Sequence, residues 1–218
     1  GGAGRDSLNG NTGDDVVHGG DGDDGLLSES GEGNDQLYGD AGNDNFSIYS
    51  YHSTSETVTA DGGDGDDRFT LYMAPYGKRS VTLTGGGGTD TYAFLYGGYT
   101  VNVPITDFAA GIGGDRIDVT ELLNYSAADG RGYSGGNPMD PAQGYLRLVQ
   151  DGANTLLQYD EDGAAGTQYD WHTTLTLRGV NATALTADNF VGNIPPDGST
   201  VPGLTLNGTD GDDSLQGS

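Results

Sequence analysis

Large apolar residues recur every nine positions at the start of the chain, separated by glycine-rich polar segments. In residues 1–47 each unit follows the pattern Gly-Gly-x-Gly-x-Asp-x-U-x, where U is a large apolar residue. Five units occupy 1–9, 10–18, 19–27, 30–38 and 39–47, and Ser28-Glu29 is a two-residue insertion between the third and the fourth. One inward apolar residue after each tight polar turn predicts a short strand. The repetition therefore predicts a solenoid of stacked coils, with two units in each coil.

A longer period follows the first coils. Glycine, aspartate and aromatic positions recur at 23 residues: Gly39, Gly62 and Gly85; Asp44, Asp67 and Asp90; Phe46, Phe69 and Tyr92. Three such units cover 39–107. We expect each to keep one glycine turn, and loops near 50–57, 74–80 and 97–100 to replace the opposite turn. The apolar alternation within each unit predicts longer strands, so the roll should widen into a larger parallel β-helix.

Residues 105–194 lose the repeat. The alternation in 145–150 and 155–160, joined by the turn 151–154, predicts a hairpin. Residues 173–180 predict another strand, and 186–191 a closing turn or short helix. The last coil of a solenoid exposes apolar side chains and an unpaired edge, so some cap is required. We divide the chain into a solenoid at 1–107, a β-rich cap at 108–194, a Pro- and Gly-rich linker at 195–206 and a restarted array at 207–218.

The charge balance changes the picture of folding. The 218 residues carry 33 acidic and 8 basic side chains, a formal net charge of −25, and no cysteine. Such a charge opposes compaction, and with low hydrophobicity it usually predicts disorder. It also excludes nucleic acid and anionic membranes as partners, since both need a basic face. The absence of cysteine excludes disulfides and leaves a bound metal as the expected stabilising device.

The repeat has the chemistry of a calcium site. Glycines at positions one, two and four allow positive φ angles and a tight turn that points carbonyl oxygens inward. The aspartate at position six adds a carboxylate. Ca²⁺ takes six to eight such oxygen ligands, whereas Mg²⁺ prefers to keep several waters. One turn cannot fill that shell, so neighbouring turns on one side should share each ion. Asp6 and Asp24 should face one ion, because they lie 18 residues apart.

On these motifs, in 1–93 and 208–218, the chain resembles the RTX, or haemolysin-type calcium-binding repeat, family of bacterial proteins exported by type I secretion. The resemblance implies that each ion takes the position-six aspartate and the carbonyls of positions two and four from one turn. Carbonyls one and three and the aspartate of the next turn complete the shell. Residues 105–194 resemble the caps of such arrays and the calcium-rich modules of alginate epimerases.

Carried over residue by residue, the resemblance implies five ions and a candidate sixth at a degenerate turn, with these ligands: Gly2, Gly4, Asp6, Gly19, Asp21 and Asp24; Asn11, Gly13, Asp15, Ser30, Glu32 and Asp35; Gly20, Gly22, Asp24, Gly39, Ala41 and Asp44; Asp40, Gly42, Asp44, Gly62, Asp64 and Asp67; Gly63, Gly65, Asp67, Gly85, Gly87 and Asp90; and, for the sixth, Gly86, Gly88, Asp90 and Asp115. The sequence departs from the pattern at Asn11, Ser30, Asp40 and Thr209, where turn geometry rather than ligation is in question.

The function expected from these features is a non-enzymatic calcium-binding module, secreted or at a bacterial cell surface, that folds on calcium after type I secretion. The restarted array predicts a large, multi-module protein of the adhesin kind. The type I machinery and a cell-surface ligand are the expected partners besides calcium, and no transmembrane segment is expected. The alternative is a carbohydrate-binding accessory module of an enzyme that modifies polysaccharides. Ice binding would need a regular row of threonines, and Thr59, Thr82 and Thr106 do not extend into one.

Other candidate residues have simpler explanations. Trp171 beside His172 could stack on a sugar, but cover for the cap is the simpler role of these aromatic residues. The three histidines stand in unrelated contexts, which does not suggest a transition-metal site. The acidic run 160–163 could hold another Ca²⁺ or form a solvated turn, and 129–144 is either a functional loop or an insertion. No catalytic motif with a nucleophile, metal or phosphate loop is present, so no enzyme is expected.

Overall fold

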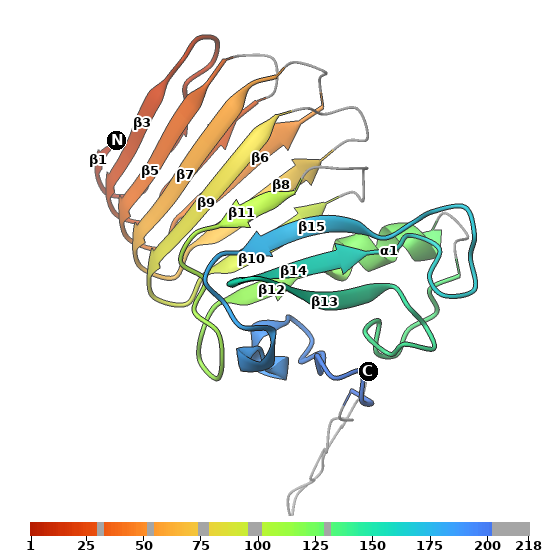
Figure 1. Ribbon diagram of the computed structural model, residues 1–218. Helices are drawn as coiled ribbons and strands as arrows, with labels where there is room; N and C mark the ends of the chain where they lie inside the picture. Colours follow the sequence, from red (N-terminus) through yellow and green to blue (C-terminus); the bar gives the residue numbers. More distant parts are fainter. Residues whose placement is uncertain (30–32, 52–54, 74–78, 96–101, 129–131, 202–218) are drawn as a thin grey trace, which may run out of the picture.

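The repeats form a parallel β-solenoid whose two sheets face each other across an apolar core (Figure 1). The computed structural model describes residues 1–29, 33–51, 55–73, 79–95, 102–128 and 132–201. The predictions for Ser30, Glu32, the second array at 207–218 and much of the loops near 50–57, 74–80 and 97–100 lie outside these residues. So do residues 129–131 and the linker after residue 201.

Sheet A begins with one strand from each coil: β1 (Gly2–Ala3), β3 (Val16–Asp21), β5 (Asp35–Ala41), β7 (Thr57–Asp64), β9 (Ser80–Gly87) and β11 (Val103–Ile105). Sheet B contains β2 (Ser7–Asn9), β4 (Gly25–Ser28), β6 (Asn45–Ser50), β8 (Arg68–Met73), β10 (Thr91–Leu95) and β12 (Arg116–Asp118). The pairing along these coils is parallel throughout. The predicted all-β solenoid is confirmed.

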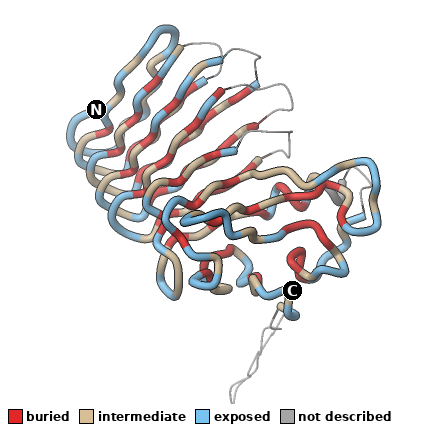
Figure 2. Tube along the Cα trace, viewed as in Figure 1, coloured by how far each residue is buried: buried red, intermediate tan, exposed pale blue. Residues whose placement is uncertain are grey.

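The 23-residue period sets the register of the wide coils. Phe46 pairs with Phe69, which pairs with Tyr92, and Val58 pairs with Val81. The three aromatic rings stack along the core, with centroids 4.6 and 5.2 Å apart, and all three side chains are buried. Buried and exposed positions alternate along the strands (Figure 2). Equal coil lengths therefore place like residues above one another, as the spacing predicted.

The cap continues both sheets beyond the last wide coil. The predicted hairpin is present as β13 (Leu146–Asp151) and β14 (Asn154–Tyr159), and the predicted strand after it is β15 (His172–Leu177). Strand β15 pairs with the edge of β11, so the hairpin extends sheet A without a break at residue 107. The edge of sheet B is covered by residues near Phe190, which forms a bridge with Ile117. Both edges of the last coil are thus paired.

Three short helices complete the cap. The helix α1 (Thr120–Ala128) was not expected from the sequence, whereas the 3₁₀ turn η2 (Ala187–Asn189) lies where a closing turn or short helix was predicted. A second 3₁₀ turn, η1 (Ala182–Ala184), precedes it. The Tyr159 hydroxyl donates to the carbonyl of Leu122, which ties the hairpin to α1. Within the described residues no helix has the length and hydropathy that a membrane crossing requires.

Candidate metal centre

The position-six aspartates form a ladder on one side of the solenoid, which we call the first turn column. Each backbone amide donates to carboxylate Oδ1 of the aspartate one coil later. These hydrogen bonds are 2.7 Å from Asp6 to Asp24, 2.7 Å from Asp24 to Asp44, 2.7 Å from Asp44 to Asp67, 2.9 Å from Asp67 to Asp90 and 3.0 Å from Asp90 to Asp115. The ladder holds each carboxylate in one orientation inside its turn.

At three of these aspartates, each of which forms one rung of the ladder, the second carboxylate oxygen has no hydrogen-bond partner. Oδ2 of Asp24, Asp44 and Asp67 is buried and has no hydrogen-bond partner. Burial of an unpaired carboxylate oxygen is costly, so its presence at successive rungs calls for a missing partner. A cation at each rung would supply that partner.

Glycine at position one leaves room beside each of these oxygens. A methyl group on Gly39 would lie 2.2 Å from Asp44 Oδ2 and 2.3 Å from the carbonyl oxygen of Gly62. On Gly62 it would lie 2.0 Å from Asp67 Oδ2 and 2.3 Å from the carbonyl oxygen of Gly85. Each niche thus joins a carboxylate of one turn to a carbonyl of the next. This donor set suits Ca²⁺, which binds six to eight oxygen atoms and takes both carboxylates and backbone carbonyls among them.

The other expected carbonyl ligands are also in register. Strand pairing aligns Gly2 with Gly20, Gly20 with Asp40, Asp40 with Gly63 and Gly63 with Gly86. The amides of position four donate to the carbonyls of position three one coil later, through Gly4 to Asp21, Gly22 to Ala41, Gly42 to Asp64 and Gly65 to Gly87, at 2.6–2.8 Å. The structure therefore brings together the turn residues that the resemblance grouped around each ion in this column.

Non-glycine residues keep the turn geometry at two of the departures from the pattern. Asn11 and Asp40 adopt φ angles of 62° and 71° at position two. Asparagine and aspartate tolerate this left-handed region better than other side chains. The turns at these two positions are therefore preserved.

The electrostatics of the column favour a cation. Burial raises the pKa of Asp67 from 3.8 to about 7, and the carboxylates of Asp90 and Asp44 add to the rise. Burial likewise raises the pKa of Asp90 to about 6, with Asp115 adding to it, and raises that of Asp44. Without a bound cation these groups hold protons that exposed aspartates release.

The last turn of the column differs from the others. Asp115 uses both carboxylate oxygens within the protein, since Oδ1 accepts from the amide of Asp90 and Oδ2 accepts from the amide of Ala109 at 2.8 Å. The buried side-chain amide of Asn189 donates to the carbonyls of Ala109, Gly111 and Asp115 at 3.4, 3.1 and 2.8 Å. The turn at 110–115 is therefore closed by protein groups from the cap.

The opposite side carries a shorter second turn column. The amide of Asp15 lies 3.4 Å from Asp35 Oδ1, and Asp15 Oδ2 is buried without a partner. Asp35 Oδ2 is different, because it accepts from the Ser28 hydroxyl and from Arg79 at 2.8 Å. This column thus offers one niche of the same kind, between the turns of Asp15 and Asp35.

Position five, which the repeat pattern leaves variable, forms a second ladder. Asp23 Oδ1 accepts from the amide of Asn43 at 2.9 Å, Asn43 Oδ1 from Asp66 at 2.7 Å and Asp66 Oδ1 from Thr89 at 2.7 Å. The second column repeats this with Asp14, Asn34 and Thr57. The signal was the recurrence of Asp or Asn at position five, whose short side chains bond to nearby backbone.

The candidates outside the repeat are placed apart from these niches. The Arg147 guanidinium lies 4.2 Å from the centre of the Trp171 ring and covers one of its faces. Asp160 and Asp162 lie in one turn of the cap, and burial raises the pKa of Asp160 to about 6. Among the described residues no three His, Cys, Asp or Glu side chains converge to hold a metal by themselves, so the niches depend on backbone oxygens.

Comparison with known proteins gives the following matches. A family model described as the RTX calcium-binding nonapeptide repeat, in 4 copies, matches residues 1–32, 27–47 and 205–218. Among solved structures, the chain is similar to the AlgE6R3 subunit of a mannuronan C5-epimerase from Azotobacter vinelandii, with 26% identity over 98% of this chain and 93% of that chain and a TM-score of 0.37. A search of curated proteins found no match.

Proposed function

We propose that this chain, in which the expected RTX nonapeptide repeats are confirmed, is a calcium-binding module of a bacterial protein that folds outside the cell when calcium fills its turns. The observation that carries the proposal is the row of buried carboxylate oxygens without partners at Asp24, Asp44 and Asp67. Each faces a backbone carbonyl of the next coil across a space that a methyl group would fill. We assign no catalytic role to the chain.

Five ions fit the geometry best. Four would lie in the first turn column, between successive aspartates from Asp6 to Asp90, and one in the second column between Asp15 and Asp35. A sixth ion at Asp115 is disfavoured because groups of the cap already fill its turn: the amide of Ala109 donates to Oδ2 of Asp115, and the side-chain amide of Asn189 donates to the carbonyl of Gly111. The ligand sets given for the first five ions in the sequence analysis are those we propose.

Calcium dependence would couple folding to compartment. Extracellular calcium modules bind at about 10⁻⁴–10⁻³ M, so cytosolic calcium would leave the turns empty and the chain open for type I export. Outside, each filled site stabilises the fold by about 1.4 kcal/mol for every tenfold excess of calcium over Kd. Several sites together would offset the repulsion of a chain with net charge −25.

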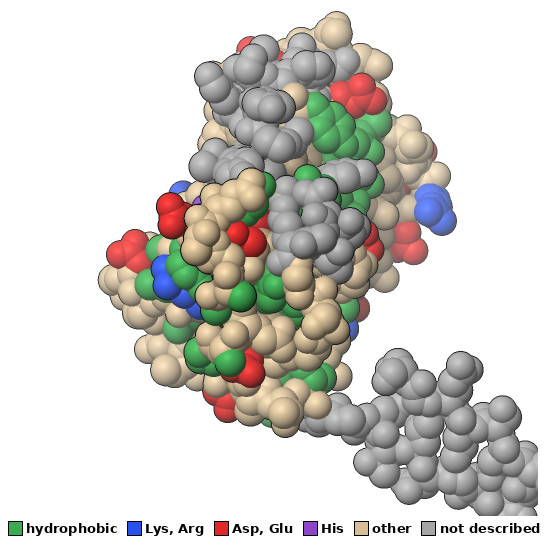
Figure 3. Space-filling model, turned by 90° about the vertical axis from the view of Figure 1, so that its right-hand side faces the viewer, with side chains coloured by type: hydrophobic (Ala, Val, Ile, Leu, Met, Phe, Trp, Pro, Cys, Tyr) green, Lys and Arg blue, Asp and Glu red, His purple; other side chains and the backbone are tan. Residues whose placement is uncertain are grey.

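A surface protein with several modules is the context that we propose. A copy of the repeat at 205–218 follows the Pro- and Gly-rich segment and restarts the array. A glycan-binding accessory module is the weaker candidate, because Arg147 covers one face of Trp171. Lys and Arg side chains are few and separated on the face shown in Figure 3, which does not suit a polyanionic glycan. Glycan binding that is lost in Trp171→Ala would favour that candidate instead.

Circular dichroism during a calcium titration tests the main proposal. The metal-free chain, titrated from chelator to about 10 mM Ca²⁺, should gain β signal cooperatively, while the same titration with Mg²⁺ should not. Equilibrium dialysis at saturation should count about five ions, one for each niche. A native-like β spectrum in chelator, unchanged by calcium, would contradict calcium-driven folding.

A further inference from the structure

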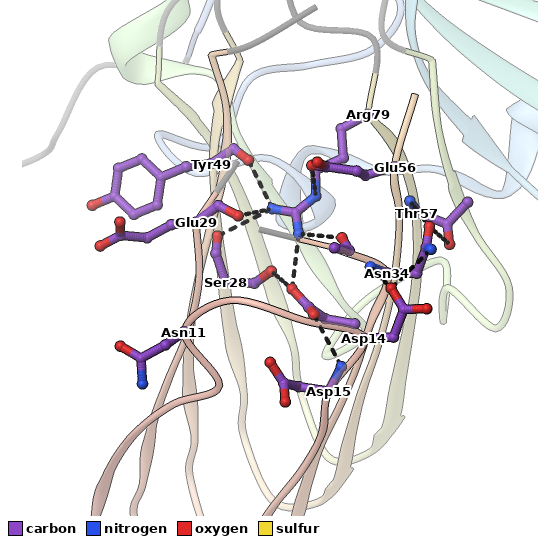
Figure 4. A network of polar contacts seen from close by, with 12 residues as sticks. Asn11, Asp14, Asp15, Ser28, Glu29, Asn34, Tyr49, Glu56, Thr57 and Arg79 are labelled. Carbon is purple, nitrogen blue, oxygen red and sulfur yellow. Dashed lines mark hydrogen bonds and ion pairs between the residues drawn. The ribbon is translucent and has the colours of Figure 1, made fainter. Parts of the chain in front are cut away.

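Arg79 is the most deeply buried cation among the described residues. Its side chain is 1% exposed, and it stands directly before β9 on the side of the second turn column. Figure 4 shows its guanidinium pointing inward between Ser28, Tyr49 and Glu56. A buried charge is tolerated only when it is paired and hydrogen-bonded, so the groups around Arg79 show what this place requires.

Oxygen atoms from three successive coils surround the guanidinium. Four of them are carbonyl oxygens, on Ser28 at 3.4 Å, Glu29 at 2.8 Å, Tyr49 at 3.1 Å and Gly33 at 3.3 Å. Two are carboxylate oxygens, on Asp35 at 2.8 Å and Glu56 at 3.7 Å. Six oxygens of mixed carbonyl and carboxylate type form the donor set that Ca²⁺ takes in proteins.

Asp35 connects this cage to the metal niches. Its Oδ1 faces the amide of Asp15, as in every other rung, but its Oδ2 bonds to Arg79. At Asp15, one coil earlier in the same column, Oδ2 is buried without a partner. The column therefore changes, from one coil to the next, from a niche whose Asp15 Oδ2 has no protein partner to a cage that contains a guanidinium cation.

The register explains why the change occurs here. Asp35 pairs with Val58, so the next coil has no position-six aspartate on this side. Glu56, two residues before Val58, supplies the second carboxylate in its place. Thr57 pairs with Ser80, which places Arg79 one coil beyond Glu56, from where its side chain reaches back into the cage.

We propose that Arg79 is a built-in cation that takes the place of the next calcium ion in the second turn column, and that its oxygen cage is a latent calcium site. This inference rests on the proposed function, because it takes the neighbouring niches as calcium sites. Calcium–oxygen distances of about 2.3–2.6 Å are shorter than those around the guanidinium, so an ion that replaced it would draw the loops inward or keep a water.

The test counts ions in Arg79→Ala. Equilibrium dialysis and native mass spectrometry should find one more bound Ca²⁺ than in the unaltered chain. Arg178→Ala is the matched control, because it removes one exposed positive charge from the cap and should leave the count unchanged. The double variant R79A/E56Q should lose the additional ion, since Glu56 is not a ligand of any repeat site. Arg79→Lys keeps a cation in the cage and should bind no additional ion.

Stability supplies the second readout. In chelator, Arg79→Ala should lose more β signal than the unaltered chain, and calcium should restore it. An unchanged ion count in folded Arg79→Ala would overturn the inference, and so would full stability in chelator. A variant that stays unfolded at every calcium concentration would also count against it, because the cage would then have failed to accept the metal. If the unaltered chain itself binds no calcium, the proposed function fails instead.

Discussion

The backbone amide of Asp44 donates a 2.7 Å hydrogen bond to Oδ1 of Asp67, whose Oδ2 is buried without a partner. One oxygen of the carboxylate therefore fixes the stacking of two coils, while the other faces an oxygen-lined niche. The same side chain thus stabilises the stacking of the coils and faces the proposed metal niche. This explains how a chain with so many acidic groups can bury some of them in its turns.

Asp67→Asn should separate these two roles. The amide oxygen can still accept from Asp44, but the charge that faces the niches on either side is lost. We expect calcium affinity to fall at least tenfold, about 1.4 kcal/mol, with a lower ion count in a calorimetric titration. Asp64→Asn is the control in the same turn, because Asp64 is a proposed ligand only through its backbone carbonyl, which the change keeps, and its exposed side chain takes no part in the ladder. Equal effects from the two variants would contradict the assignment.

Gly62→Ala should damage the fold in a way that calcium cannot repair. The added methyl would lie 2.0 Å from Asp67 Oδ2 and 2.3 Å from the Gly85 carbonyl, so the niche must open. We expect a loss of unfolding free energy of about 1–3 kcal/mol, in the range of overpacked sites, measured by urea unfolding in saturating calcium. Gly87→Ala should be tolerated, because a methyl group there would make only ordinary contacts, 3.6 Å from Asp64 Oδ1 and 4.0 Å from the Gly63 carbonyl, and Ala41 already stands at the same repeat position.

The metal-free fold should be more stable in mild acid than at neutral pH. Burial raises the pKa of Asp67 to about 7 from 3.8, so the folded state holds the proton more tightly than the unfolded chain. That stabilising contribution is present at pH 4 and is lost as the pH rises toward about 7. Circular dichroism of the metal-free protein should show more β signal at pH 5 than at pH 7.5.

With calcium present the trend should reverse, because protons compete with the metal for the same carboxylates. Asp67→Asn should flatten the metal-free profile, since it removes the carboxyl group whose pKa burial raises to about 7. A metal-free β signal that rises steadily from pH 5 to pH 7.5 would contradict the assignment of these carboxylates as buried and unpaired.

Asn189→Ala should weaken the cap whether or not calcium is bound. The side chain is buried and bonds to three carbonyls of the last turn and to the amide of Gly111. Leaving these groups without partners costs about 1–3 kcal/mol for each buried group that water cannot reach. Asn124→Ala, on the exposed side of α1, is the control. Urea unfolding in saturating calcium should shift to lower urea for Asn189→Ala, and the residual β signal in chelator should fall. Neither quantity should change in the control.

The solenoid could be predicted from the sequence because the spacing of the repeated residues sets the length of each coil and its register. A 23-residue period aligns Phe46 with Phe69 and Tyr92, and all three rings are buried in the core. The turn column was predictable for the same reason. The register of the hairpin followed from alternation around a turn at 151–154, as the pairing of β13 with β14 confirms.

Arg79 could not be found this way. Its partners lie 23 to 51 residues earlier in the chain and are mostly backbone carbonyls, which leave no trace in the sequence. Helix α1 was missed because its two buried leucines, Leu122 and Leu123, are adjacent rather than spaced at helical intervals. The role of Asn189 depends on a loop that folds back onto the last turn. Each of these features is decided by tertiary contacts rather than by a local pattern.

The aspartate ladder has a direction. Every rung donates from an earlier coil to a later one, and the series stops at Asp115, whose own turn supplies the final donor. The coils are therefore stacked in one direction from a fixed end at the cap. A coil with its own position-six aspartate could be inserted or removed between two rungs without changing the cap. None could be added beyond Asp115. The number of coils can therefore vary, and the number of ions varies with it, while the cap marks the end of the series.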